Sequence, residues 1–184
     1  NVPPSDARKQ DDANVEGEAW YFLDGMGIPS LEDENSSLEP SEMQFHRAKE
    51  LFQDIYAKAD YSIVSSSKQD DGTFAVKVTV KPMNIYTLLI DNYEDGFAAF
   101  WEKFDAVDTD SMGDDEFATW YTNVFAPAFY DTLLDVLEAQ IPNIGYKDEK
   151  SIVIQIQQGE EGGLLISNQD WQNLDELIID YSGE

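Results

Sequence analysis

The stretch Thr73-Phe-Ala-Val-Lys-Val-Thr-Val80 places an apolar side chain at every second position. This two-residue period is typical of a β-strand with one buried face and one solvated face. A second run, Ser151-Ile-Val-Ile-Gln-Ile-Gln157, repeats the alternation with three isoleucines. We therefore predict that residues 74–80 and 152–156 belong to one antiparallel sheet, and that helices cover its single apolar face.

Turn sequences beside both runs predict two β-hairpins. Gln69-Asp-Asp-Gly72 is an Asp-Gly turn that would join a strand over residues 61–65 to the central run. Gly159-Glu-Glu-Gly-Gly163 would join the second run to a short strand over residues 164–166. The predicted fold class is α+β, a curved antiparallel sheet of about four strands in two hairpins with helices packed on one face.

Two stretches before the first hairpin predict helices. Residues 18–26 indicate one or two helical turns with Trp20 and Leu23 packed inward. A polar loop over residues 29–40 follows. Ser41 and Gln44 have the spacing of a capping box, so we expect a longer amphipathic helix to begin there.

The helical pattern between the hairpins is expected to be interrupted. Asn84 can cap a helix that breaks near Asp95-Gly96. The longest apolar stripe covers residues 117–141, and Pro127 inside it removes one hydrogen bond, which predicts a kink or two abutting helices. Either Ser167 or the following asparagine caps a last helix.

The first 17 residues differ from the rest in composition. They carry Pro, Ser, Asp, Asn and Gln and very few apolar side chains, which is typical of a flexible acidic tether. Residues 18–184 are long enough to bury a substantial core, and we predict that they form a single α+β domain. The chain begins at Asn1 without methionine, as it would after removal of a leader.

The charge restricts the partners. The chain has 11 Lys and Arg against 38 Asp and Glu, a net charge of −27. Such a surface repels nucleic-acid phosphates and anionic lipids, so we predict no nucleic-acid partner and membrane contact only through a lipid anchor. The expected partner is an unknown protein or small ligand. With no cysteine, the chain can form no disulfide, thiolate metal site or cysteine nucleophile.

One acidic loop partly matches a calcium-binding pattern. Asp108, Asp110 and Asp114 are the candidate ligands, in the segment Asp108-Thr-Asp-Ser-Met-Gly-Asp-Asp-Glu116. Met112 and Thr119 stand where two oxygen ligands are required. Because carboxylates in a first helical turn are also favoured by the helix dipole, the prediction is that no metal is bound.

The sequence contains no recognisable catalytic constellation. His46 is the only histidine, which disfavours most hydrolase and zinc sites, and no nucleophile elbow, phosphate-binding glycine loop or HExxH motif is found. We predict no catalytic residue and no cofactor. An isomerase of the ketosteroid type would need a tyrosine hydroxyl beside a buried carboxyl. Tyr86, Tyr93, Tyr121 and Tyr130 could supply that hydroxyl.

Aromatic residues are concentrated in the region of residues 97–121. Most of them are expected in the core, but part of the set could line a pocket, since pockets are commonly aromatic. The residues proposed to line it are Phe97, Trp101, Phe104, Trp120 and Tyr121.

Two segments carry a family resemblance. Residues 76–85 (VKVTVKPMNI) and 163–179 (GLLISNQDWQNLDELII) resemble uncharacterised secreted lipoproteins of Gram-positive bacteria, over about residues 18–181. The resemblance implies a cystatin-like or ketosteroid-isomerase-like fold, in which a curved sheet is wrapped by helices. It also implies an acidic tether after a lipid-modified cysteine. That cysteine is missing here, and the family supplies no catalytic residues.

These observations favour an extracytoplasmic, membrane-tethered lipoprotein domain that binds a protein or small ligand without catalysis. Two alternatives stay open. One is a cytoplasmic acidic inhibitor, such as an immunity protein or a nucleic-acid mimic, for which the charge is the motive. The other is a small pocket enzyme of the ketosteroid-isomerase type.

Overall fold

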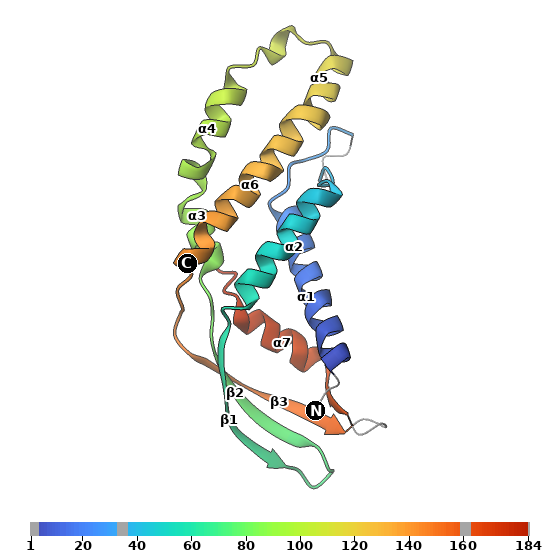
Figure 1. The fold of residues 1–184 in the computed structure, drawn as a ribbon, viewed down its shortest axis with the longest axis vertical. Coiled ribbons are helices and arrows are strands. Elements are labelled where there is room, and N and C mark those ends of the chain that lie inside the picture. Colours follow the sequence, from blue (N-terminus) through green and yellow to red (C-terminus); the bar gives the residue numbers. More distant parts are fainter. Residues whose placement is uncertain (1–3, 33–36, 159–162, 184) are drawn as a thin grey trace. The chain divides into compact units, whose positions relative to one another are not determined.

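The computed structural model describes residues 4–32, 37–158 and 163–183 (Figure 1). Contacts divide the chain into two compact units. Unit 1 consists of Asn1–Ala13, Ile55–Ile90 and Asn143–Glu184, and unit 2 of Asn14–Asp54 and Asp91–Pro142. These contacts do not test whether the units fold separately, so a single domain over residues 18–184 stays a prediction.

Two pairs of consecutive strands are separated by a run of helices, which is an α+β order. The first half contains α1 (Pro4–Gly25), α2 (Glu42–Tyr56), β1 (Asp60–Lys68), β2 (Phe74–Lys81), α3 (Ile85–Asp91) and α4 (Tyr93–Asp105). The second half contains η1 (Thr109–Ser111), α5 (Asp114–Trp120), the π-helical η2 (Tyr121–Phe125), α6 (Ala126–Gln140), η3 (Ile141–Asn143), β3 (Lys150–Gln158), β4 (Leu164–Ile166) and α7 (Asn168–Ile178).

Unit 1 contains one open, antiparallel sheet with the strand order β1-β2-β3-β4. β2 pairs with β3 from Phe74 opposite Ile156 to Val80 opposite Lys150. The predicted pairing of the two alternating runs in a common sheet is therefore confirmed. The turn predicted at residues 159–163 lies largely outside the described residues.

One face of this sheet is the apolar core of unit 1. The buried residues Val76, Val78, Val80 and Ile154 form its centre. Leu174, Leu177 and Ile178 of α7 pack against it. The Ser167 hydroxyl caps α7 by accepting a hydrogen bond of 3.0 Å from the Asp170 N–H, which confirms the first of the two predicted caps.

The segment after β2 is fixed by backbone pairing on both sides. The N–H of the buried Met83 donates to Ile178 O, and the N–H of Asp180 donates to Met83 O, both at 2.9 Å. Asn84 precedes α3 as predicted, but its side-chain oxygen accepts a 2.7 Å hydrogen bond from the Gly145 N–H. Its side chain is therefore used to join two distant segments.

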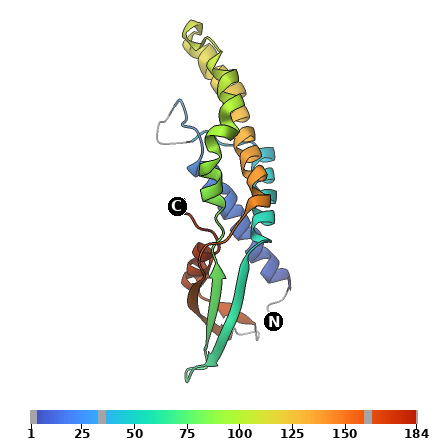
Figure 2. The same cartoon turned by 90° about the vertical axis from the view of Figure 1, so that its left-hand side faces the viewer.

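In unit 2, α4 and α6 lie side by side in both views (Figures 1 and 2). A break was predicted near Asp95-Gly96, but the break occurs at Asn92, which separates α3 from α4. Gly96 lies inside α4, where a Cβ atom would come within 2.4 Å of Val136 Cγ2. This glycine therefore permits close packing of two helices rather than interrupting one.

The predicted irregularity near Pro127 takes the form of a π-helical segment. The five residues of η2 precede α6, and the Ala126 N–H donates to Tyr121 O, five residues back. Pro127 then occupies the second position of α6, where a missing N–H costs little. The π-turn thus resets the hydrogen-bond register before the proline, so α5 and α6 follow each other without a loop.

The start of the chain differs from the prediction. α1 is a 22-residue helix, so helical conformation extends into residues 4–17, which were expected to be a tether. Whether that segment acts as a tether stays a prediction. Trp20 was expected to pack inward but is 43% exposed, and its ring lies against Phe45 at 4.5 Å. Leu23 of α1 is buried as predicted, and Phe22 is buried beside it.

The capping box at α2 is confirmed. Gln44 N–H donates to Ser41 Oγ at 3.3 Å, and Ser41 N–H donates to Gln44 Oε1 at 2.9 Å. Gln44 Nε2 also donates to Pro127 O and to Asp131 Oδ1, both at 2.9 Å. The same side chain therefore caps α2 and fixes it to α6.

We expect Ser41→Ala to lower the free energy of unfolding by about 1 kcal/mol, because one N-terminal N–H of α2 loses its acceptor. Gln44→Ala should cost more, because it removes both the cap and the contacts with α6. Urea unfolding measures both changes. Met43→Ala is the control, since this side chain is 80% exposed and should change stability by less than about 0.5 kcal/mol.

Candidate functional site

The five aromatic residues predicted to line a pocket lie in unit 2 and belong to one cluster of rings. Phe97 and Trp101 have ring centroids 6.1 Å apart, as have Phe104 and Trp120. Two further rings connect these pairs. Phe100 lies 4.5 Å from Phe104, and Phe125 lies 5.3 Å from Phe104, 5.5 Å from Trp120 and 5.3 Å from Tyr121.

In the described residues, the rings of this cluster pack against one another. Phe97 and Phe100 are buried, whereas Trp101 is 37% exposed. The Tyr121 hydroxyl donates to Pro29 O at 2.9 Å. The rings are thus brought together as predicted, while their lining of a pocket stays a prediction.

The three candidate calcium ligands share a loop but do not form a ligand set. Asp108 precedes η1, Asp110 lies within it, and Asp114 begins α5. The Ser111 hydroxyl closes the loop by donating to Asp108 O at 2.9 Å. In the described part of the chain, no three His, Asp or Glu side chains gather closely enough to hold a metal ion.

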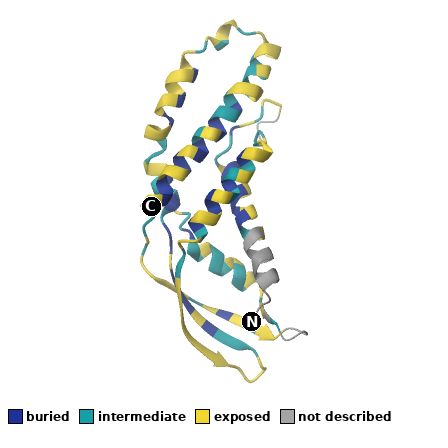
Figure 3. Ribbon diagram, viewed as in Figure 1, coloured by how far each residue is buried: buried dark blue, intermediate teal, exposed yellow. Residues whose placement is uncertain are grey.

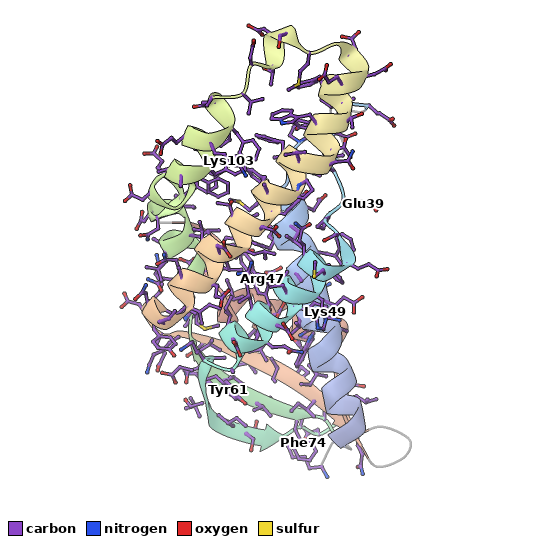
Figure 4. The ribbon with its side chains drawn as sticks, turned by 45° about the horizontal axis from the view of Figure 1, so that its top comes forward. Glu39, Arg47, Lys49, Tyr61, Phe74 and Lys103 are labelled. Atoms are coloured by element: carbon purple, nitrogen blue, oxygen red, sulfur yellow. The ribbon has the colours of Figure 1, made fainter. Side chains whose placement is uncertain are left out.

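Negative charge is concentrated in unit 2. It has 23 acidic residues against 3 basic ones, a net charge of −20, whereas unit 1 has 15 against 8, a net charge of −7. Arg47 is paired with Asp135 at 2.7 Å, and Lys49 is 3.1 Å from a Glu16 oxygen. Lys103 Nζ lies 4.7 Å from the Phe104 ring centroid. Arg47, Lys49 and Lys103 are labelled in Figure 4. All three cations of unit 2 are therefore engaged.

Three of the four tyrosines proposed as hydroxyl donors have a raised pKa. The Tyr130 hydroxyl donates to Leu38 O, and burial raises its pKa to about 12. Burial also raises the pKa of Tyr93 and of Tyr121. His46 is an exposed helical residue whose Nε2 lies 3.5 Å from Glu50 Oε1.

A different tyrosine meets a carboxyl group in unit 1. The Tyr56 hydroxyl donates to Asp175 Oδ1 at 3.0 Å. Burial is the main influence on Asp175 and raises its pKa, although the hydrogen bond from Tyr56 acts in the opposite direction. The pair joins the end of α2 to α7, residues that no sequence spacing could connect. A half-buried carboxyl beside a phenol can hold a proton.

The raised pKa of Asp175 predicts a pH effect on stability. The folded state favours the neutral carboxyl, so its stabilising contribution is full below the unfolded pKa and is lost as pH rises through the folded pKa. Relative to the natural chain, Asp175→Asn should therefore gain stability as pH rises from about 3 to 7. Urea unfolding of both proteins across this range measures the difference.

Asp148→Asn is the matched control, because Asp148 is an exposed aspartate of the same unit. It removes a carboxyl of the same chemistry from the solvent-exposed surface and gives the reference curve over the same pH range. A constant stability difference between Asp175→Asn and the natural chain would contradict the assigned effect of burial.

The most exposed apolar surface of unit 1 lies on β1. Eight of its nine residues are exposed, as Figure 3 shows along the strand. Tyr61, Ile63 and Val64 are 63%, 69% and 55% exposed. Among the described strands, only β2 pairs with β1, so β1 is an edge strand. Exposed apolar side chains on a free edge are a typical protein-docking feature.

The ladder shows which backbone groups of β1 face this edge. Gln69 N–H donates to Thr73 O at 2.8 Å, so that pair is hydrogen-bonded. Hydrogen-bonded and non-hydrogen-bonded pairs alternate along an antiparallel ladder. Starting from Thr73, Phe74 and every second residue of β2 after it are therefore in non-hydrogen-bonded pairs. The β1 residues in these pairs direct their N–H and C=O groups away from β2, toward the free edge. They are Lys68, Ser66, Ile63 and Tyr61.

A hydrogen bond of β3, the other neighbour of β2, leads to the same assignment of inward and outward residues. Gln155 N–H donates to Asp170 Oδ2 at 2.9 Å and so points away from β2. Its partner Ala75 then directs its backbone groups toward β1, where it faces Ser67. Ser67 is therefore an inward residue, and its neighbours Ser66 and Lys68 are outward ones.

The comparisons with known proteins bear on the fold. No family model and no curated protein sequence matches the chain. The chain resembles the crystal structure of the putative lipoprotein ycdA from Bacillus subtilis subsp. subtilis str. 168, with a TM-score of 0.55 and 17% sequence identity. The likeness covers 90% of this chain and 45% of that one, so this chain spans less than half of that protein.

This likeness supports an α+β architecture with an open, four-stranded antiparallel sheet. Of the helices in the described residues, none combines the length and hydropathy that a membrane crossing needs.

Proposed function

We propose that the chain is the extracytoplasmic domain of a membrane-tethered lipoprotein and that it binds another protein without catalysing a reaction. The structural likeness to ycdA over 90% of the chain supports the lipoprotein part of this proposal. The cystatin-like curvature of the sheet belongs to the same proposal. The net charge of −27 is compatible with a tether that is repelled by anionic headgroups and held only through a lipid.

One observation carries the binding part. β1 combines a free edge with three exposed apolar side chains, Tyr61, Ile63 and Val64. Solvation of such a strand is unfavourable, and strand addition would satisfy its outward backbone groups. Figure 4 labels Tyr61 on β1 and Phe74 on the neighbouring β2.

Two measurements test the two parts separately. Metabolic labelling with an alkyne palmitate, followed by mass spectrometry of the native N-terminus, tests the anchor. A labelled, diacylated cysteine ahead of Asn1 is the expected result, and an unmodified N-terminus would remove the anchor from the proposal. For binding, proximity labelling from the chain on intact cells should identify a neighbour whose labelling falls strongly with Ile63→Lys and stays unchanged with Val153→Lys.

Val153 is a matched control. It is 53% exposed on β3 of the same sheet, but it lies opposite Lys77 on the face away from α7. Equal loss of labelling with both variants would count against the edge of β1 as the binding surface.

The alternatives have their own supporting observations. An acidic inhibitor would use unit 2, where 23 acidic residues are concentrated. A pocket enzyme of the ketosteroid-isomerase type would use the pair of Tyr56 and Asp175. A small ligand would be bound by the aromatic cluster around Phe97. None of these alternatives accounts for the exposed apolar side chains on the free edge of β1, which is why protein binding through β1 is preferred.

A further inference from the structure

We infer that the partner of β1 is β1 of a second copy of this chain, paired antiparallel across a two-fold axis through the bulge at Val64. This inference rests on the proposed function, because it names the occupant of the same free edge. It would join the two four-stranded sheets into one continuous eight-stranded sheet.

The spacing of the outward residues is self-complementary. The register of β1 against β2 shifts between Ile63 and Ser65, so Val64 and Ser65 together occupy the position opposite Lys77. Distances along the strand can be counted by the β2 partner of each residue. Ile63 and Ser66 face Val78 and Val76, one position on either side of Lys77, whereas Tyr61 and Lys68 face Val80 and Phe74, three positions on either side. A two-fold axis through the bulge therefore places the outward groups of Ile63 opposite those of Ser66 in the second copy.

The same operation places Tyr61 opposite Lys68 of the second copy. Both residues share a face with Val80 and Phe74, their partners in β2. Lys68 Nζ lies 5.9 Å from the Phe74 ring centroid, so its cation already has one aromatic neighbour. A Tyr61 ring from the second copy would add a second aromatic surface to this cation. Symmetry provides the contact twice.

The charge of the hairpin permits two copies to meet here. Between Asp60 and Lys81 the chain has three aspartates and three lysines, a net charge of zero within a protein of −27. Asp60 and Lys81 neutralise each other through a 2.6 Å ion pair. Residues 61–67 carry no charge at all. Pairing two copies along this edge therefore places no like charges opposite each other, and such charges would destabilise the pair.

Two features weaken the association and make it conditional. A bulge increases the local twist of an edge, and the charge of the whole chain repels a second copy. We therefore expect the dimer to form more strongly in high salt. At about 0.5 M salt the Debye length falls to roughly 4 Å, which screens distant carboxylates but leaves a strand pairing intact.

Cysteine cross-linking tests the register directly, because the chain contains no cysteine. The Ile63→Cys and Ser66→Cys proteins are mixed in about 0.5 M salt and oxidised gently. Directly opposed, hydrogen-bonded residues have Cα atoms about 5.5 Å apart, which suits a disulfide. We expect the mixed disulfide to form at least ten times faster than in a mixture of Ser66→Cys and Val153→Cys. Equal rates would overturn the inference.

Sedimentation velocity of the cysteine-free chain provides the second measurement. The dimer fraction should rise with protein and salt concentration, and it should be lost with Ile63→Lys but kept with Val153→Lys. Circular dichroism confirms that each variant is folded. A chain that stays monomeric at all concentrations overturns the self-pairing. If proximity labelling still falls with Ile63→Lys, the proposed function stands with a different partner. If the labelling does not depend on Ile63, the proposed function and the self-pairing are both removed.

Discussion

Replacing Phe97 with alanine is expected to lower the free energy of unfolding by about 3–5 kcal/mol. Phe97 is fully buried and its ring is in contact with four others. They are Tyr93 at 4.4 Å, Phe129 at 5.1 Å, Phe100 at 5.5 Å and Trp101 at 6.1 Å. Truncation would leave a cavity between α4 and α6, since surrounding rings relax only partly. Urea unfolding followed by tryptophan fluorescence measures the loss.

The matched comparison uses Val124→Ala, which removes a 47% exposed side chain from the neighbouring η2. It should change stability by less than about 0.5 kcal/mol. A similarly small change for Phe97→Ala would show that the cluster is loosely packed, and a pocket lined by these rings would then become the better interpretation.

Gly96→Ala is expected to destabilise the chain by about 2 kcal/mol, although alanine is the better helix former. The new Cβ would lie 2.4 Å from Val136 Cγ2, and Val136 is buried against α4 with 5% exposure. Overpacking of this kind costs about 1–3 kcal/mol, which exceeds the gain of up to about 1 kcal/mol in helix propensity. The midpoint of urea unfolding should fall accordingly.

Two further variants separate packing from propensity. Gly17→Ala in α1, where no atom lies within 4 Å of the new Cβ, should stabilise the chain by up to about 1 kcal/mol. Combining Gly96→Ala with Val136→Ala should cost less than the two single changes together, because the double variant removes the clash. Additive costs would place the effect of Gly96→Ala elsewhere.

Local patterns predicted the elements that depend on local chemistry. The capping box at Ser41, the cap at Ser167 and the alternation in β2 and β3 each require only neighbours within four residues. They were predicted correctly for that reason. The extent of β1 was underestimated, because Ser66 and Ser67 have weak strand preference and belong to the strand only through pairing with β2.

Errors arose where packing overrides local preference. Gly96 was interpreted as a break, yet it lies in α4 because Val136 needs the space. Trp20 was expected inside together with Leu23, but Phe22 and Leu23 occupy the buried face of α1 and Trp20 is exposed. The irregularity at Pro127 was anticipated, but its solution as a π-helical segment depends on the hydrogen bonds available before it.

The sequence by itself determined the α+β class, the pairing of the two alternating runs and the lack of cysteine chemistry, because composition and two-residue periodicity express these directly. Only the tertiary structure decided the meeting of Tyr56 with Asp175, the outward set of groups on β1 and the close approach of Gly96 to Val136. Each of these depends on residues more than a helical turn apart, whose distance is set by packing and sheet register and has no local signature in the chain.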